Sequence, residues 1–223
     1  MGDRRKLGDI IRQQLEKEYT LTPEDIGGDA HLSRKGMTFE TQSYTVEGLG
    51  HLCVLNMKAM LGLMKMETVV LSVFDRDVPL INLDWISAFG KETQLNELYA
   101  TQISPYPQQK LDEFSRIKDA DSDLTDYVSA PSWYDGIKYD CTYHKTGKKI
   151  SQRLSSAAAE YIAAFADQLK DADICDPEIK KEKIRDFACT LVQKGGPAVN
   201  QFTGLFGKET AERLILKHMY GVK

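Results

Sequence analysis

METVVLSVFDRDVPLINLDW, residues 66–85, is the stretch of this sequence that decides the fold. Two runs rich in Val, Leu and Ile flank a short polar turn near Asp75 to Asp77, a pattern that predicts two consecutive β-strands. Parallel strands need a crossover of about a dozen residues or more, so these two strands are expected to pair in antiparallel fashion. Asp84 breaks the apolar pattern. A carboxylate buried without a partner costs free energy, so a residue of this type in a buried strand calls for an explanation.

Strand-like segments continue on both sides of this pair. The runs MTFETQSYTVE and HLCVLNMKAM, between Met37 and Met60, precede it and are separated by glycines. Strands that follow each other so closely form an antiparallel meander. The segment SWYDGIKYDCTYH, residues 132–144, is expected to return one or two strands to the same sheet.

Helical periodicity marks the two ends of the chain. Apolar residues at helical spacing predict an amphipathic helix over residues 3–18, and these residues are Leu7, Ile10, Ile11 and Leu15. Further helices are expected between Gln108 and Tyr127, from Lys148 to Leu169, from Pro177 to Gln193 and from Pro197 to His218. Together the elements predict an α/β protein with one domain over residues 1–223. The expected architecture is a three-layer α/β/α sandwich with a central, mainly antiparallel sheet.

Composition excludes several classes of partner. The 223 residues carry a net charge of -4, which argues against a general binder of nucleic acid. No segment has the apolar core of a signal peptide or the length of a membrane span, so we expect a cytoplasmic protein with no membrane partner. A plastid stroma is the alternative if the host is photosynthetic and a transit peptide has been removed. The four cysteines lack metal-ligand spacing and are expected to be free thiols, so no metal site is predicted.

Common catalytic signatures are absent from the sequence. It contains no GxGxxG after a strand, no Walker loop, no GxSxG elbow and no HExxH. The segment KGGPAV, residues 194–199, either cradles a phosphate or marks the break between two helices, and the second interpretation is favoured. Each of the four histidines is isolated in the sequence and is interpreted as a surface or satisfied polar residue.

Two acidic residues on the central strands are the main catalytic candidates. Pairing about the turn puts Glu67 opposite or diagonal to Asp84, so the two carboxylates could face one another across the sheet. Like charges that close are unfavourable, and one carboxyl would then keep its proton near neutral pH and serve as a proton donor. The alternative is structural: Glu67 lies in solvent at the strand edge, and Asp84 accepts hydrogen bonds from backbone amides.

Four segments resemble one known family in the same order. METVVLSVFDRDVPLINLDW, APSWYDGIKYDCTYHKTG, KKISQRLSSAAAEYIAAFADQL and FTGLFGKETAERLILKHMYG are similar to the corresponding segments of the ferredoxin-dependent bilin reductases. This family includes enzymes that form phycocyanobilin and phycoerythrobilin, and it is related to the reductase of red chlorophyll catabolite. The resemblance spans roughly residues 37–223, so the chain resembles a single bilin-reductase domain.

Three positions depart from the family pattern. Glu67 stands where the phycocyanobilin-forming branch has a histidine, and Asn82 with Leu83 replace an aromatic–glycine pair. Gly195 and Gly196 replace an Asn–Asp pair at the start of a C-terminal helix. These differences bear on which product is formed.

The resemblance implies a concrete chemistry. Family members reduce biliverdin or a related open-chain tetrapyrrole by coupled one-electron and proton transfers, with electrons from external reduced ferredoxin and no bound cofactor. It implies that Asp84 donates the proton and that Glu67 relays or shares it. The residues expected to bind substrate are Asn82, Trp133 and Asn200.

A basic face for ferredoxin is expected near the start of one helix, and its candidate residues are Lys145, Lys148, Lys149 and Arg153. The alternative for these residues is a solvated helix start. Two alternatives to the enzyme also remain. One is a non-enzymatic tetrapyrrole-binding protein on the same fold, and the other is an unrelated α/β/α enzyme.

Overall fold

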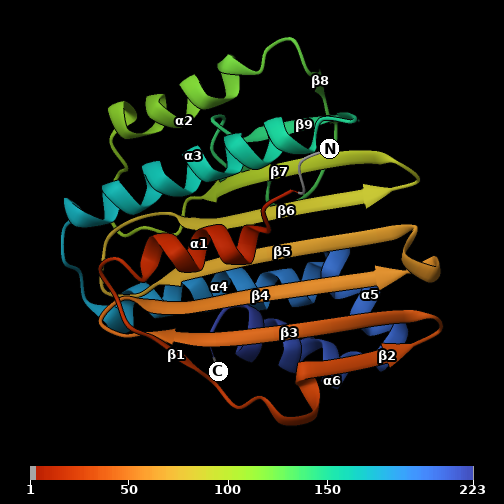
Figure 1. Ribbon diagram of the computed structural model, residues 1–223. Helices are drawn as coiled ribbons and strands as arrows, with labels where there is room; N and C mark the ends of the chain where they lie inside the picture. The colour runs from red at the N-terminus through yellow and green to blue at the C-terminus, as the bar shows by residue number, and fades with distance from the viewer. Residues whose placement is uncertain (1–3, 223) are drawn as a thin grey trace.

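A computed structural model describes residues 4–222 of the chain, and its centre is a nine-stranded antiparallel sheet (Figure 1). The strand order is β1-β3-β4-β5-β6-β7-β9-β8, and β2 also pairs with β3. The strands are β1 (Leu21–Pro23), β2 (His31–Arg34), β3 (Met37–Val46), β4 (Gly50–Ala59), β5 (Met64–Val73), β6 (Leu80–Ala88), β7 (Lys91–Tyr99), β8 (Thr125–Asp126) and β9 (Tyr143–Lys148). The antiparallel meander predicted from the sequence is confirmed.

Helices cover both faces of this sheet. In Figure 1, α1 and α3 lie in front of the strands, α2 lies beside α3, and α4, α5 and α6 lie behind. The helices are α1 (Leu7–Leu15), α2 (Gln108–Ala120), α3 (Ser151–Lys170), α4 (Pro177–Lys194), α5 (Pro197–Phe206) and α6 (Lys208–Arg213), and a π-helical turn η4 (Leu214–Met219) follows α6. The predicted α/β/α sandwich is therefore confirmed. No helix among residues 4–222 is long and apolar enough to span a membrane.

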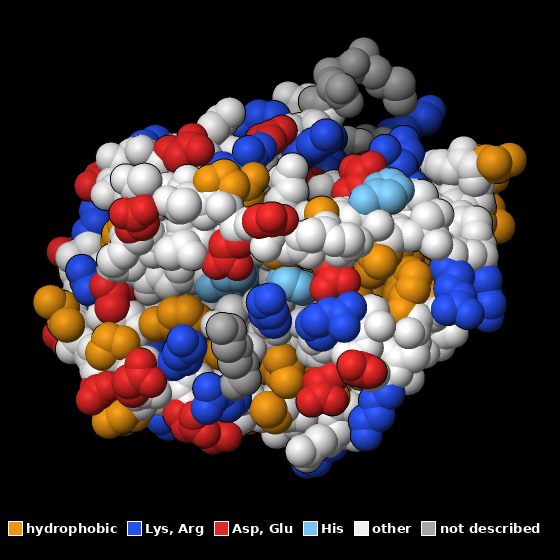
Figure 2. Space-filling view, turned by 90° about the horizontal axis from the view of Figure 1, so that it is seen from below, with side chains coloured by type: hydrophobic (Ala, Val, Ile, Leu, Met, Phe, Trp, Pro, Cys, Tyr) orange, Lys and Arg blue, Asp and Glu red, His pale blue; other side chains and the backbone are white. Residues whose placement is uncertain are grey.

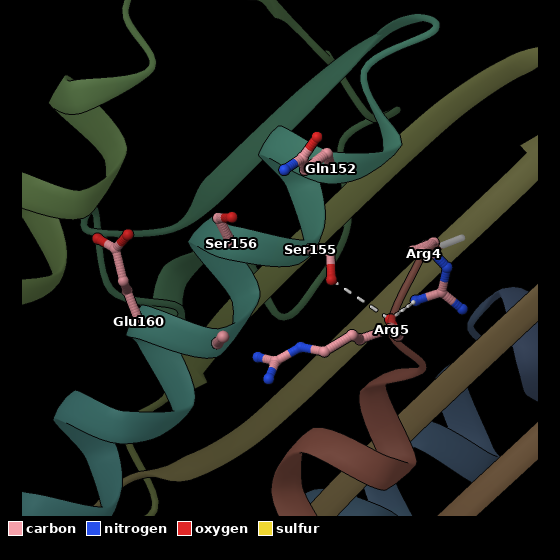
Figure 3. A pocket seen from close by; sticks show the side chains of 7 residues that line it. Arg4, Arg5, Gln152, Ser155, Ser156 and Glu160 are labelled. Atoms are coloured by element: carbon pink, nitrogen blue, oxygen red, sulfur yellow. Dashed lines mark hydrogen bonds between the residues drawn. The ribbon is translucent and has the colours of Figure 1, made fainter. Parts of the chain in front are cut away.

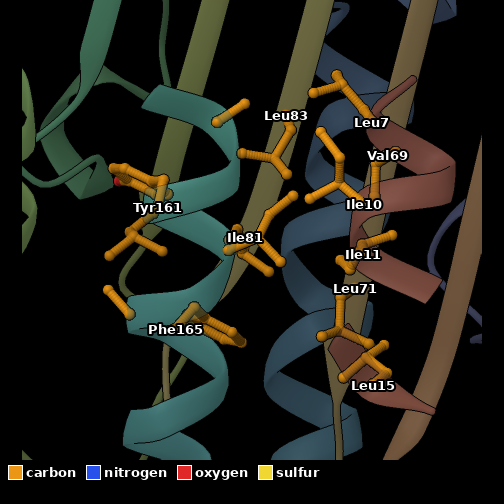
Figure 4. Packing of buried hydrophobic residues seen from close by; sticks show 14 of the residues in the cluster. Leu7, Ile10, Ile11, Leu15, Val69, Leu71, Ile81, Leu83, Tyr161 and Phe165 are labelled. Atoms are coloured by element: carbon orange, nitrogen blue, oxygen red, sulfur yellow. The ribbon is translucent and has the colours of Figure 1, made fainter. Parts of the chain in front are cut away.

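The apolar stripe of α1 packs on the front face of the sheet. Figure 4 shows the side chains of α1 meeting those of β5 and β6 beside α3, and the contacting residues include Leu7, Ile10, Ile11, Leu15, Val69, Leu71, Ile81, Leu83, Tyr161 and Phe165. The periodicity that predicted an amphipathic N-terminal helix is thus the packing stripe of α1. The helix is shorter than the predicted 3–18, and the predicted start at residue 3 lies outside the described residues.

A second apolar core fills the back face, and aromatic side chains dominate it. Phe39 on β3 meets Phe202 and Phe206 of α5 in edge-to-face contacts, with ring centroids 5.2 and 5.7 Å apart. Phe187 of α4 packs on Tyr99 at the end of β7, with centroids 5.0 Å apart. Such pairs add to the free energy of apolar burial and fix α4 and α5 against the sheet.

The C-terminal region differs from the predicted single helix over 197–218. Gly207 adopts a φ of 88°, which a side chain disfavours, and it separates α5 from α6. Gly195, with a φ of 85°, ends α4 in the same way, and α5 restarts at Pro197. The favoured interpretation of KGGPAV as a break between helices is therefore confirmed. Of the segment SWYDGIKYDCTYH, only the final Tyr143 and His144 enter a strand, β9.

Charges of both signs lie on the face of the molecule that Figure 2 shows. This view looks onto the edge formed by β1 to β3, and Lys/Arg and Asp/Glu side chains are interspersed there without a dominant basic area among the described residues. This face does not have the single-sign charge that attracts nucleic acid.

Glu67 anchors α1 to the sheet. It lies on the front face of β5 and is only 2% exposed. Its carboxylate accepts hydrogen bonds from Leu7 N at 3.0 Å and Gly8 N at 2.9 Å, and it forms an ion pair with Arg4. These N–H groups at the helix N-terminus have no partner within the helix, and the helix dipole favours a negative charge at this point. Gly8 approaches closely, since a Cβ there would lie 2.6 Å from Val54.

We expect Glu67→Ala to destabilise the protein by about 2–4 kcal/mol, because it leaves buried N–H donors and Arg4 without their acceptor. The stability of Glu67→Gln should lie between those of the parent and Glu67→Ala. Urea unfolding followed by circular dichroism measures the change, and Glu40→Ala, at an exposed position of β3, is the matched control. If Glu67→Ala unfolds at the parental urea concentration, Glu67 does not anchor α1.

Candidate functional site

A cluster of polar side chains interrupts the apolar back face of the sheet over β5, β6, β7 and β9. We call it the polar cluster, and its members are Thr68, Asn82, Asp84, Glu97, Tyr99, Lys138 and His144. Residues paired across antiparallel strands point to the same face. One row of pairs therefore runs from Thr68 through Asp84 and Leu95 to His144, and the neighbouring row joins Asn82 to Glu97. The polar cluster faces the same side as α4 and α5.

Among the described residues, Asp84 accepts hydrogen bonds only from neutral donors. Its Oδ1 accepts from the Thr68 hydroxyl, and its Oδ2 accepts from Asn82 Nδ2 at 2.7 Å. Burial raises the pKa of Asp84 to about 6, and the charge of Glu97 acts in the same direction, against the two hydrogen bonds. Asp84 as a whole residue is still partly exposed, although burial of its carboxyl group dominates its pKa.

Glu97 has stronger partners. It is 7% exposed, and it accepts hydrogen bonds from the Tyr99 hydroxyl at 2.6 Å and from His144 Nε2 at 2.8 Å. Lys138 Nζ lies 3.4 Å from the same carboxylate. Burial alone would raise the pKa of Glu97, but the hydrogen bonds from His144 and Tyr99 and the nearby positive charge lower it on balance.

The two carboxyl groups on this face therefore bind a proton with different affinities. Glu97 is ionised, and Asp84 exchanges its proton within the working pH range of most proteins. A pair of carboxyl groups whose environments separate their pKa values is the arrangement in which one acts as an acid and the other as a fixed charge.

The predicted contact between Glu67 and Asp84 is wrong. The pairing about the turn is close to the predicted one, since Glu67 pairs with Trp85 and Thr68 with Asp84. Successive side chains of a strand point to opposite faces, however, so Glu67 lies under α1 while Asp84 faces α4 and α5. Glu67 is also buried and paired, which excludes the alternative that it lies in solvent. The predicted proton relay from Glu67 to Asp84 requires a contact between these residues, and the structure does not contain it.

Glu97 and His144 were missed in the sequence. His144 was interpreted as an isolated polar residue, and Glu97 lies in the run KETQLNELY, where charged residues recur without a motif. They meet only because β7 pairs with β9 across a connection of more than forty residues. The signal that could have found them is strand alternation, which places residues 95, 97 and 99 on one face of β7.

The three predicted substrate-binding residues lie in different places. Asn82 is in the polar cluster, where it donates to Asp84. Trp133 packs on Tyr134 and Phe187, and its Nε1 donates to the Gly195 carbonyl at 3.0 Å. Tyr134 in turn contacts Tyr99, with centroids 5.8 Å apart, so Trp133 borders the same region through its neighbour.

Asn200 lies outside the polar cluster. It is exposed on α5 and borders a surface cavity of about 800 Å³ between α4, α5 and α6. The structure therefore places Asn82 against Asp84 and connects Trp133 to the polar cluster through Tyr134. Asn200 is not part of this arrangement.

Aspartates neutralise half of the proposed basic face. Lys145 is buried and pairs with Asp126 at 2.7 Å. Arg153 pairs with Asp121 and Asp123 at 2.5 and 2.6 Å. Lys148 and Lys149 remain exposed at the end of β9 and in the following turn, so two of the four candidate residues present a free charge to solvent.

The described residues contain no cluster of three His, Cys, Asp or Glu side chains that could hold a metal ion. Cys53 and Cys141 are buried, Cys175 and Cys189 are partly buried, and all four are free thiols. Burial raises the pKa of Cys53 to about 12, so this thiol is not a nucleophile at neutral pH.

No family model and no curated protein matches the sequence. The fold, in contrast, is similar to a solved structure, that of phytochromobilin synthase from tomato in complex with biliverdin. The TM-score is 0.75, and the match covers 97% of this chain and 83% of that chain at 13% sequence identity. The chain shares the fold of phytochromobilin synthase. At this identity the likeness is one of fold, and it agrees with the family resemblance found in the sequence.

The raised pKa of Asp84 predicts a pH dependence of stability. The folded state holds this proton more tightly than the unfolded state, where the pKa is near its ordinary value of 3.8. The stabilisation from Asp84 is therefore fully present below that value and is lost as the pH rises through about 6. Asp84→Asn removes this dependence. The free energy of unfolding of the variant, measured relative to that of the parent, should therefore rise by about 1–3 kcal/mol from pH 4 to pH 7.

Urea unfolding of parent and variant across this pH range tests the prediction. Asp171→Asn, at an exposed position, is the control and should track the parent. A constant difference between Asp84→Asn and the parent at every pH would show that Asp84 titrates normally.

Proposed function

We propose that this protein reduces an open-chain tetrapyrrole, biliverdin or a related bilin, with Asp84 as the proton donor. Electrons arrive one at a time from an external donor of the ferredoxin type. The observation that carries the proposal is a partly exposed aspartate whose carboxyl group, desolvated by burial, has a pKa raised to about 6 on the sheet face toward the C-terminal helices. The supporting comparison is the fold of a protein whose structure was solved with biliverdin bound.

The chemistry requires a proton at the moment of electron transfer. Reduction of one double bond takes two electrons and two protons, and an electron enters a conjugated system more easily once a proton has neutralised the developing negative charge. Asp84 can supply a proton because its carboxyl group is neutral in a large fraction of molecules near pH 6. Because the residue is partly exposed, we expect its carboxyl group to regain a proton from solvent between the two steps.

Glu97 fits a complementary role in this proposal. It remains ionised, held by Tyr99, His144 and Lys138. Its charge favours the proton on Asp84 before transfer, and it would stabilise the positive charge that a bilin gains on protonation. In this proposal Asp84 donates the proton, and Glu97 takes the supporting role that the sequence analysis had given to Glu67.

Asp84→Asn keeps the size of the side chain and removes the transferable proton. We expect biliverdin to bind within a few-fold of the parental affinity and single-turnover reduction by photoreduced ferredoxin to fall by at least about a hundredfold. Absorption spectra of the bilin complex measure both quantities. Thr68→Val removes a donor to Asp84 without removing its proton and should cost much less. Parental turnover in a folded Asp84→Asn variant would remove Asp84 from the reaction.

Glu97→Gln should move the pH profile of reduction. The charge of Glu97 raises the pKa of Asp84, so its removal lowers that pKa, and activity should decline at lower pH than in the parent. Glu92→Gln makes the same change on the same strand but on the opposite face, and it should leave the profile in place. If the pH profile of reduction is the same in Glu97→Gln as in the parent, the charge of Glu97 does not affect the pKa of Asp84.

The alternative is a tetrapyrrole-binding protein without turnover. The pairing of Lys145 and Arg153 with aspartates favours it, because it reduces the basic surface that would attract an acidic electron donor. Tight binding of biliverdin with complete recovery of unchanged pigment, after incubation with several reduced ferredoxins, would establish this alternative.

A further inference from the structure

Two hairpin turns carry exposed apolar side chains at the same end of the sheet, the right-hand end in Figure 1. The turn between β4 and β5 holds Met60, Leu61 and Leu63, and the turn between β6 and β7 holds Phe89. Leu61 is fully exposed, and Phe89 is 65% exposed. Phe89 N donates a hydrogen bond to the Leu63 carbonyl at 3.2 Å, so the turns lie side by side. We call these four side chains the tip patch.

The backbone of the two turns does not favour apolar residues. Met60, Leu61 and Phe89 have φ values of 52°, 56° and 51°. Residues other than Gly, Asn and Asp rarely adopt this left-handed conformation, because their Cβ atom comes close to the carbonyl oxygen. An asparagine would fit each position with less strain and would expose less apolar surface. The turns alone therefore do not account for the tip patch.

Lysines flank the tip patch as pairs of like charge. Lys58 is the partner of Lys65 across β4 and β5, and Lys91 is the partner of Lys148 across β7 and β9. Because side chains alternate along a strand, the first pair lies on the front face of the sheet and the second on the back face. Like charges directly opposite each other destabilise a sheet, so these pairs also are not explained by the fold.

Carboxylates are absent from this end of the sheet. Residues 34–37, 58–65, 88–91 and 147–150, which form its turns, contain no Asp or Glu. The nearest carboxylates along the adjoining strands are Glu67 and Glu92, which are buried, and Glu40, which lies three residues into β3. Further exposed basic residues in these turns are Arg34, Lys35 and Lys149. At the right-hand end of Figure 2, hydrophobic and Lys/Arg side chains lie together.

The segment that leads into α1 borders this end on the front face. Arg4 pairs with Glu67, two residues along β5 from Lys65. The Arg5 carbonyl accepts hydrogen bonds from Arg4 Nη1 at 3.0 Å and from Ser155 Oγ at 3.4 Å (Figure 3). These contacts hold the segment against α3, and the exposed side chains of the tip patch are not covered by it.

An apolar patch between lysines fits an anionic membrane surface. Lysines gain free energy beside lipid phosphates, and apolar side chains gain it just below them. Acyl chains take up a protruding side chain of any shape, whereas a folded partner needs a pocket that matches Leu61. A second copy of this chain does not fit, because it would place lysines against lysines.

We propose that this end of the sheet attaches the protein to the surface of a membrane that contains anionic lipids. The tip patch enters the interface, and the four lysines lie against the lipid phosphates. The expected lack of a membrane partner rested on the lack of a spanning segment, which attachment to the surface does not require. The tip patch shares no residue with the polar cluster, so this proposal does not rest on bilin reduction.

Flotation with lipid vesicles tests the proposal. The vesicles contain phosphatidylcholine alone or phosphatidylcholine with about one third phosphatidylglycerol, and we expect at least about tenfold tighter binding to the second kind. This binding should weaken as the salt concentration rises from about 0.1 M to about 1 M, because the Debye length falls from about 10 Å to about 3 Å. Absence of binding to the anionic vesicles at the lower salt concentration would overturn the proposal.

Leu61→Asn and Phe89→Asn test insertion of the tip patch. Asparagine tolerates a positive φ, so the turns keep their backbone, and melting temperatures check the fold. Each variant should bind anionic vesicles at least about tenfold more weakly than the parent. Ile174→Asn makes a similar change at an exposed position beside Arg76, at the opposite end of the sheet, and should bind like the parent. Parental binding in both tip variants would overturn the proposal.

Lys65→Gln and Lys91→Gln test the charges, and each should weaken binding to anionic vesicles about fivefold. Lys183→Gln, at an exposed position of α4, is the control and should not. A protein partner predicts a different result. If the protein does not bind vesicles but binds an acidic ferredoxin or a second copy of itself, and Leu61→Asn weakens that complex, the tip patch is a protein interface and the membrane proposal is wrong.

Discussion

The antiparallel register between β5 and β6 is the constraint on which the rest of the structure depends. It sets Thr68 against Asp84 and Glu67 against Trp85. Because side chains alternate along a strand, this register sends the two buried carboxyl groups to opposite faces. A shift of one residue would exchange the faces of a whole strand, along with the apolar residues that bind the helices. The apolar contacts of α1, α3 and α4 therefore also fix where each carboxyl group lies.

The two faces treat a buried carboxyl group in different ways. On the front face, Glu67 meets backbone N–H groups and an arginine, which compensate its charge and make it part of the packing of α1. On the back face, Asp84 meets a hydroxyl and an amide, which are too weak to offset its desolvation, so its pKa rises. Glu97 takes the charged partners that this face offers. The difference between structural and reactive carboxyl groups thus lies in their donors.

Local pattern was sufficient to predict the layers but not the site. Alternating and helical periodicities predicted the meander, the helices on both faces and the break at Gly195, because each depends on residues close in sequence. The register was nearly right, yet the face of Glu67 was wrong, since one residue decides it. Glu97 and His144 could not be found, because their contact depends on the pairing of β7 with β9 across a long connection. The resemblance to the bilin reductases pointed to Asp84 and was silent about these partners.

Asp84 interrupts the apolar pattern of β6 with a carboxyl group. Positions where a sequence departs from the pattern of its own fold are expected at functional sites. Glu67 departs from the pattern as well, but its contacts with α1 explain the departure completely. Asp84 has no such explanation, because its two neutral donors leave it less stable as a carboxylate than it would be in water. The arrangement does favour a neutral carboxyl group that can release its proton near pH 6, beside a carboxylate that keeps its charge. A proton-coupled reduction uses that property, and a structural role does not require it.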